Sequence, residues 1–268
     1  MTGVVTKSTG SWYIVRDENS KQYQCRIRGK FRIKGIKSTN PITVGDHVDF
    51  ELEKEGNTGI INNIHDRKNY IIRKSVNLSK QTHILAANID QAFLFVTLDH
   101  PTTFPSFIDR FLATAEAYSI ETVLLFNKID LYNDELIAKK NDLLEIYSNI
   151  GYTCIEISVT EKINITAVEK LMKNKVNIFS GHSGVGKSSL INVIATDLNL
   201  KIAKISSQHR QGQHTTTFAE MFALPFGGYI IDTPGIKGFG VVDFEQNEIG
   251  DFFREFFAFG CEYLIQKD

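Results

Sequence analysis

An apolar stretch that runs directly into a glycine-rich turn and a helix start constrains this chain most strongly. Residues 176–180 read VNIFS, and residues 181–188 read GHSGVGKS. This spacing fits the phosphate-binding loop (P-loop), in which backbone NH groups converge on phosphate oxygens at a helix N-terminus. A glycine turn without a ligand is the alternative, but average residue usage gives a chance match in only about one chain in a hundred.

Each residue type in this loop has an expected role. Lys187 would place its charge at the β and γ phosphates and act in catalysis, and the Ser188 hydroxyl would bind Mg²⁺. The nucleotide-binding residues predicted in the loop are Ser183, Gly184, Val185, Gly186, Lys187, Ser188 and Ser189.

A second motif, NKID, follows the apolar segment 121–126, where parallel strands end and ligands bind. The Asp130 carboxylate can accept two hydrogen bonds from the N1 and N2 edge of guanine, whereas adenine offers no such pair of donors. Lys128 would lie along the base and Asn127 would tie this loop to the P-loop. An exposed polar turn is the alternative reading. The pattern therefore predicts GTP rather than ATP. A site whose buried polar groups stay unpaired with the wrong ligand favours the right one by a factor of about 10⁴ or more.

A short block, ISVT at residues 157–160, resembles the motif that supports the base in GTPases, through Ser158 and Val159. Taken alone, this block has little specificity.

The apolar segment 228–231 ends in DTPG, residues 232–235. Asp232 can hold a Mg²⁺-bound water and the Gly235 NH can sense a γ-phosphate. The preceding polar stretch HRQGQHTTT, residues 209–217, indicates a switch loop in which Thr215 or Thr216 binds Mg²⁺ when the γ-phosphate is present. Thr217 could instead begin a strand. The predicted Mg²⁺ residues are Ser188, Thr215, Thr216 and Asp232.

The residue that positions the attacking water is less obvious, because Ile236 follows DTPG where many GTPases place a glutamine. His214 is the best candidate, since its ring nitrogen can hydrogen-bond near neutral pH. A surface or purely structural histidine is the alternative. Lys187 and Thr216 complete the predicted catalytic set.

Strand and helix patterns alternate from Asp90 onward. This alternation predicts an α/β P-loop GTPase domain with a doubly wound, mostly parallel sheet. The expected strands are 93–99, 121–127, 152–158 and 176–180, and the expected helices are 106–119, 134–149, 165–172 and 187–195. The motif order, with NKID before the P-loop, indicates a circular permutation that keeps every motif at one sheet edge.

Residues 1–72 carry short alternating segments, 11–16, 22–28, 47–53 and 58–64, separated by turn residues. They predict an all-β barrel of the OB type, whose surface binds oligonucleotides in many proteins. The predicted domains are therefore 1–72, the GTPase domain 73–240, and a C-terminal segment 241–268 with a phenylalanine-rich helix at 249–259 that needs a partner surface.

The charge is unevenly divided. Residues 1–80 hold 15 Lys and Arg against 8 Asp and Glu, which leaves 15 against 23 in the remainder. Basic residues recur at period two, which places them on one face of a strand and predicts an RNA-binding stripe. A solvated outer face is the alternative, and the aromatic residues Trp12, Tyr13 and Tyr23 would either stack on bases or, individually, fill the core. The stripe comprises Arg26, Arg28, Lys30, Arg32 and Lys34, and Lys37 extends it.

Three scattered cysteines, Cys25, Cys154 and Cys261, match no disulfide framework, and neither a signal segment nor a membrane span is visible. We expect a cytoplasmic, monomeric protein without a membrane partner.

Together these residues resemble the RsgA (YjeQ) family of circularly permuted GTPases. The match runs through GVVTKSTGSWYIV, VGDHV, AANIDQ, IDR, NKID, GHSGVGKSSL, GQHTTT and DTPGIKGFG. The resemblance implies an OB-fold, a permuted GTPase domain, a C-terminal zinc domain, and GTP hydrolysis stimulated by the small ribosomal subunit and its rRNA. GTP or GDP with Mg²⁺ would be the ligands, and the cytoplasm of a bacterium the location.

The chain departs from that family at two places. The family's zinc module uses three Cys and a His, whereas only Cys261 stands in a comparable position here, and a structural zinc site needs four ligands. Residues 241–268 would then be a remnant of the module or part of an incomplete sequence. His182 replaces the family's usual proline, with little expected consequence because backbone NH groups bind phosphate.

Two other functions share these motifs. A GTPase of translation or signalling would ignore ribosomal subunits, and an RNA-binding module that senses GTP would bind nucleotide with little hydrolysis. Ile236 keeps the second alternative open.

Overall fold

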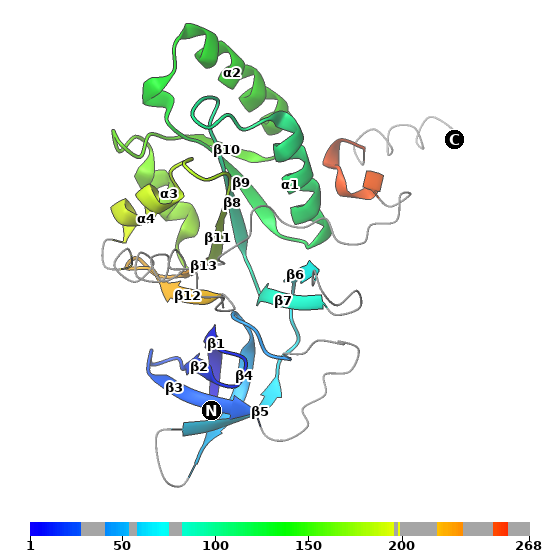
Figure 1. Ribbon diagram of the computed structural model, residues 1–268, viewed down its shortest axis with the longest axis vertical. Coiled ribbons are helices and arrows are strands. Elements are labelled where there is room, and N and C mark those ends of the chain that lie inside the picture. The colour runs from blue at the N-terminus through cyan, green and yellow to red at the C-terminus, as the bar shows by residue number, and fades with distance from the viewer. Residues whose placement is uncertain are drawn as a thin grey trace, which may run out of the picture. The chain divides into compact units, whose positions relative to one another are not determined.

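A computed structural model describes residues 1–27, 41–53, 58–74, 82–195, 198, 219–232 and 249–256 (Figure 1). The chain forms two compact units. The first comprises Met1–Asp90, Asn174–Ile178 and Lys201–Ile236, and the second comprises Gln91–Lys173, Phe179–Leu200 and Lys237–Asp268.

Five strands close into a barrel at the start of the first unit. They are β1 (Thr2–Ser8), β2 (Tyr13–Arg16), β3 (Gln22–Ile27), β4 (His47–Leu52) and β5 (Thr58–Ile64). Strand β1 pairs with both β2 and β4, β3 pairs with β2 and β5, and β4 pairs with β5, so every strand has two neighbours. The predicted N-terminal OB-type barrel is confirmed.

Alternate side chains of these strands fill the barrel. The fully or nearly fully buried core residues are Val5, Tyr13, Val15, Tyr23, Cys25, Ile42, Val48, Phe50 and Ile61. Of the three aromatic residues considered for base stacking, Tyr13 and Tyr23 lie in this core and Trp12 is 37% exposed. Burial, with a contribution from the Asp46 charge, raises the pKa of Tyr13 to about 12.

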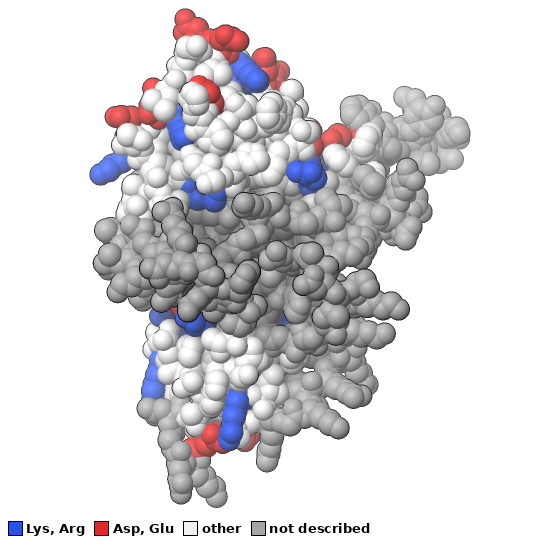
Figure 2. All heavy atoms as spheres, in the orientation of Figure 1, with Lys and Arg blue, Asp and Glu red and all other residues white. Residues whose placement is uncertain are grey.

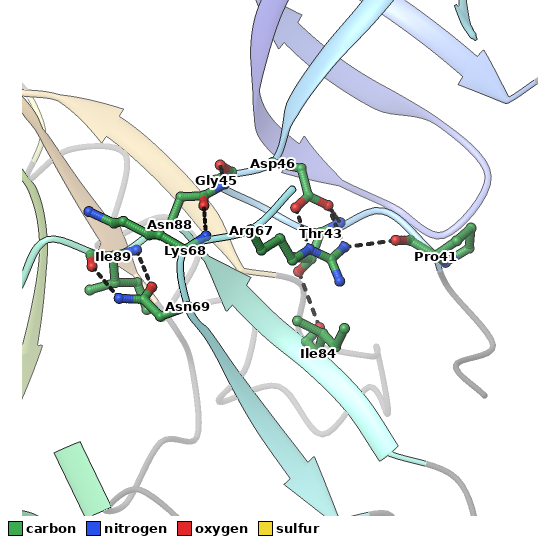
Figure 3. Close-up of polar contacts among 10 residues, drawn as sticks. All are labelled: Pro41, Thr43, Gly45, Asp46, Arg67, Lys68, Asn69, Ile84, Asn88 and Ile89. Atoms are coloured by element: carbon green, nitrogen blue, oxygen red, sulfur yellow. Dashed lines mark hydrogen bonds and ion pairs between the residues drawn. The ribbon is translucent and has the colours of Figure 1, made fainter. Parts of the chain in front are cut away.

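A hairpin of β6 (Tyr70–Lys74) and β7 (Thr82–Ala87) follows the barrel, and a buried ion pair lies at its base. The Arg67 guanidinium donates from Nε and Nη2 to the two Asp46 carboxylate oxygens, at 2.6 and 2.7 Å, and Nη2 also reaches the Pro41 carbonyl at 2.8 Å (Figure 3). Thr43 donates its backbone NH to Asp46 and its hydroxyl to the Ile84 carbonyl of β7. We call Pro41, Thr43, Asp46, Arg67 and Ile84 the polar joint.

The rest of the first unit is built from β11 (Val176–Ser180), whose first residues belong to it, β12 (Glu220–Ala223) and β13 (Tyr229–Asp232). Strands β12 and β13 form an antiparallel hairpin, and β13 runs parallel to β11. The structure thus brings the strand that ends at Asp232 beside the strand that leads to the P-loop.

The second unit is an α/β layer structure. Strands β8 (Gln91–Val96), β9 (Glu121–Phe126) and β10 (Thr153–Glu156) pair in parallel, and every residue of β8 is buried. Its helices are α1 (Pro105–Ala117), α2 (Asp134–Asn149), α3 (Ile165–Met172) and α4 (Lys187–Ile194), with a short 3₁₀ turn, η1 (Ile129–Leu131), between β9 and α2. The predicted α/β P-loop domain with mostly parallel strands is confirmed.

Local chemistry sets the helix limits. Helix α1 begins with Pro105, whose missing NH costs nothing in a first helical turn. Helix α2 is capped by Asn133, whose side-chain oxygen accepts the Leu136 NH at 3.0 Å. Both limits follow from residues that are visible in the sequence.

Part of the phenylalanine-rich C-terminal segment packs within the second unit. It forms a 3₁₀ turn, η2 (Ile249–Phe252), and the Phe253 and Phe256 rings contact each other. Arg254 donates to the Gly151 carbonyl at 3.0 Å, pairs with Glu116 of α1 at 2.6 Å and lies over the Tyr152 ring. Residues 257–259 of the predicted helix lie outside the described residues.

Among the helices that the structure describes, none is both long and apolar enough to cross a membrane.

Candidate nucleotide-binding site

The P-loop of residues 181–188 connects β11 to α4, as its sequence predicts. Gly181, Gly184 and Gly186 adopt left-handed φ angles of 131°, 86° and 103°. A Cβ atom on Gly186 would lie 2.3 Å from the Asn127 side-chain nitrogen, and one on Gly181 would lie 2.8 Å from the Phe95 carbonyl oxygen. Only glycine fits these two positions, because both the backbone angle and the space exclude a side chain.

The polar residues of the loop are accessible at the start of the helix. Ser183, Gly184, Ser188 and Ser189 are exposed, whereas Val185 is fully buried and anchors the loop. A phosphate here would meet the backbone NH groups and the positive end of α4, and the Ser188 hydroxyl is open to a cation.

The Lys187 ammonium group lies within the loop. Its Nζ donates to the carbonyl oxygens of Gly181 and His182, both at 2.6 Å. Burial lowers the pKa of Lys187. A phosphate bound by this loop would therefore meet an ammonium group that is already oriented and partly shielded from water.

His182 is held against α1, since its ring lies 4.2 Å from the Phe107 ring, centroid to centroid. The residue that replaces the family's usual proline thus packs against the helix.

Asn127 joins three of the predicted motifs. Its side-chain NH₂ donates to the Val185 carbonyl of the P-loop at 2.7 Å, and its side-chain oxygen accepts the Val159 NH at 3.3 Å. Ser158, in the same block as Val159, is fully buried and accepts the Glu161 NH at 3.0 Å. The phosphate loop and the two base loops are therefore fixed to each other through one amide.

The two other polar residues of the NKID motif, Lys128 and Asp130, indicate a base site at the same strand end. Lys128 has a left-handed φ of 67°, and its Nζ donates to the His100 carbonyl at 2.5 Å. Asp130 lies in η1 and is exposed, so its carboxylate can accept hydrogen bonds from a ligand.

Tyr132 is a contributor that no motif predicted. Its hydroxyl accepts the Leu98 NH and donates to the Asn127 carbonyl, both at 2.9 Å. Burial raises the pKa of Tyr132, so the phenol stays protonated and able to donate. The only sequence signal was a tyrosine two residues after Asp130.

Replacing Tyr132 by phenylalanine should therefore weaken GDP binding by up to about thirtyfold, because each of the two lost hydrogen bonds contributes roughly 1 kcal/mol to the order of the base loop. Titration of a fluorescent GDP analogue measures the change. Tyr147→Phe is the matched control, since that hydroxyl donates to Asp109 on α1 and contacts none of the nucleotide-binding motifs. Equal affinities in the two variants would exclude this role for Tyr132.

Other predicted site residues are only partly described. Asp232 is the last residue of β13. His214, Thr215, Thr216, Gly235 and Cys261 lie outside the described residues, as do Arg28, Lys30, Arg32, Lys34 and Lys37 of the basic stripe. Arg26, the remaining member of the stripe, is exposed on β3 and pairs with Glu53. Within the described part of the chain, no group of three or more His, Cys, Asp or Glu side chains could hold a metal ion.

A P-loop on a parallel sheet, tied through Asn127 to a base loop that precedes it in the chain, defines a circularly permuted P-loop GTPase. The family model described as RsgA GTPase matches residues 64–242, and the model described as RsgA N-terminal domain matches residues 2–61. The chain belongs to the RsgA family, and it is a GTP-hydrolysing enzyme that uses GTP, GDP and Mg²⁺.

Relatives and solved structures agree with this assignment. The chain is 61% identical over 259 residues to the small ribosomal subunit biogenesis GTPase RsgA of Christiangramia forsetii. The matched residues cover 96% of this chain and 82% of that protein. It is similar in structure to YjeQ from Thermotoga maritima, with a TM-score of 0.78, 34% identity and coverage of 95% and 82% of the two chains. It is also similar to YloQ, described as a circularly permuted GTPase, with a TM-score of 0.72, 29% identity and coverage of 96% and 79%.

Proposed function

We propose that this protein is a GTPase of small ribosomal subunit biogenesis, which binds the small subunit and its rRNA and hydrolyses GTP to GDP and phosphate during late maturation. The names of its relatives support the process, and the Asn127 bridge between the phosphate and base loops supports the nucleotide. The protein would act as a monomer in the cytoplasm.

In this proposal the guanine base is bound by Asn127, Lys128 and Asp130, with support from Ser158 and Val159. The P-loop residues 183–189 bind the phosphates, Gly235 contacts the γ-phosphate, and Ser188, Thr215, Thr216 and Asp232 hold Mg²⁺. Lys187 and Thr216 stabilise the charge that develops on the phosphoryl group, and His214 orients the attacking water.

The barrel would be the rRNA-binding part. The first 80 residues carry the excess of basic side chains, and Arg26 is exposed on β3 as the first member of the basic stripe, which continues to Lys37. By contrast, Figure 2 shows acidic side chains over α2, where Asp134, Glu135, Asp142 and Glu145 are exposed. Phosphate groups would be attracted to the first region and repelled by the second. Cys261 alone supplies one of the four ligands that structural zinc needs, so we propose no zinc site from it.

GTP turnover measured with and without purified small subunits tests the function. We expect stimulation of at least about tenfold by small subunits and none by large ones. Binding to the small subunit would order the proposed switch residues 209–217 around the γ-phosphate. His214→Ala should bind GTP normally and lose the stimulated turnover. Equal turnover with both subunits would indicate a GTPase of translation or signalling, and tight GTP binding with no turnover under any condition would indicate a GTP-sensing module.

A further inference from the structure

The β12–β13 hairpin connects the two segments that we propose to bind Mg²⁺ and sense the γ-phosphate. Strand β12 begins shortly after Thr217, and β13 ends at Asp232. The two strands pair in antiparallel register, and Glu220 lies directly opposite Asp232. The place of β12 therefore fixes the backbone at Asp232.

The first barrel strand, β1, pairs with β12 at Glu220, the register partner of Asp232. Lys7 of β1 lies opposite Glu220 in the β1–β12 pairing, and its ammonium group donates to the Glu220 carboxylate at 2.8 Å. Residues directly opposite each other in antiparallel strands lie on the same face of a sheet and interact. One row across three strands thus leads from Lys7 of the barrel to the position of Asp232.

A second barrel cation contacts the other end of the hairpin. The Arg16 guanidinium of β2 lies over the Tyr229 ring, 5.8 Å from its centroid, within the range of a cation–π interaction. Tyr229 pairs with Ala223 beside the turn of the hairpin, whereas Glu220 and Asp232 form its open end. The barrel therefore holds this hairpin at two points.

The opposite edge of the hairpin is attached to β11, the strand that continues into the P-loop. Ile178 and Ile231 are register partners, and the Asn177 side chain donates to the Tyr229 carbonyl at 3.0 Å. Because β13 is also fixed to β11, a shift of β12 relative to the barrel would change the backbone position of the residues at the open end of the hairpin.

Charge gives the Lys7–Glu220 pair its particular effect. The Lys7 ammonium group attracts the Glu220 carboxylate and thereby holds β12 against the first barrel strand. An acidic side chain in place of Lys7 would repel Glu220 instead.

We propose that Lys7 and Glu220 are positioning residues for GTP hydrolysis, through which the barrel sets the place of Asp232. This rests on the proposed role of Asp232 in holding Mg²⁺. Because the base and phosphate loops bind the nucleotide without either residue, the pair acts on the rate of hydrolysis rather than on affinity.

Intrinsic GTP turnover of the full chain, without ribosomal subunits, tests the inference. Lys7→Glu replaces attraction by repulsion and should lower kcat about three- to tenfold, with KM and GDP affinity within about twofold of the original protein. The double variant Lys7→Glu, Glu220→Lys restores the pair in reverse and should recover kcat to within about twofold. With saturating small subunits, the maximal rate should follow the same pattern.

Two further variants separate the possible outcomes. Lys21→Glu makes the same charge change at a barrel residue whose ammonium group lies over the Tyr23 ring, 5.0 Å from its centroid, and it should leave kcat unchanged. Asp232→Asn should abolish turnover, and full turnover in that variant would overturn both the Mg²⁺ role and the inference. If Asp232→Asn is inactive while Lys7→Glu keeps its full kcat, or the double variant stays slow, the inference alone is wrong.

Discussion

Replacing Asp130 by asparagine is expected to weaken GTP binding about a thousandfold and to give the protein a preference for xanthosine triphosphate. Guanine presents two NH donors on its N1 and N2 edge, and a carboxylate accepts both. An asparagine side chain has one acceptor and one donor group, so a guanine NH would face an NH₂ group and remain unpaired. A site built around a polar partner loses a factor of about 10⁴ when that partner is missing, and asparagine, which keeps one acceptor, should lose somewhat less. Xanthine carries a carbonyl at the second position, which the new NH₂ group can bind.

Calorimetric titration of the variant with the two nucleotides measures this exchange. Asp134→Asn is the matched control, since it removes the same charge from an exposed residue at the start of α2, close to Asp130 in the chain. The control should bind GTP as the original protein does. An Asp130→Asn protein that keeps its GTP affinity, or that binds xanthosine and guanosine triphosphates equally weakly, would show that the base lies elsewhere.

The elements that the sequence predicts best are those whose limits are set by local chemistry. Helices α2 and α3 and strands β5 and β11 have the predicted bounds, and α2 starts at the Asn133 cap. Strand β1 was not predicted because its pattern is irregular. A bulge between Val5 and Lys7 in the pairing with β2 breaks the alternation, so that Val5 and Thr6 are both buried.

The residues of the candidate site are likewise of two kinds, those that a sequence motif predicts and those that only the fold reveals. Residues such as Asn127 and Lys187 belong to motifs whose spacing reflects a loop that must surround a phosphate or a base, so sequence alone predicts them. Tyr132 contributes through two single hydrogen bonds, to Leu98 and Asn127, and these leave no periodic or spaced pattern. The Lys7–Glu220 contact joins residues that are 213 positions apart in the chain, which only the fold brings together.

The polar joint is a further pairing that no sequence pattern reveals, and its removal should have the largest effect on stability. The Asp46 side chain is fully buried, that of Arg67 is 7% exposed, and the pair is bidentate. Truncation to Arg67→Ala would leave the Asp46 carboxylate buried with the Thr43 NH as its partner. Removing one member of a buried pair typically lowers the free energy of unfolding by about 3–5 kcal/mol, since an uncompensated charge remains out of water.

Urea unfolding followed by tryptophan fluorescence measures this change in the barrel itself, because the chain has one tryptophan, Trp12, beside the barrel strand β2. Arg26→Ala is the control, since the Arg26–Glu53 pair is largely solvated and such pairs contribute at most about 1 kcal/mol. The double variant Arg67→Met, Asp46→Leu should recover part of the loss, because apolar side chains of similar volume replace buried ion pairs at little cost. A barrel that unfolds at the same urea concentration in Arg67→Ala and in the original protein would mean that the joint is dispensable. Recovery in the double variant would instead attribute the loss to the buried charge of Asp46, and not to the missing packing of the Arg67 side chain.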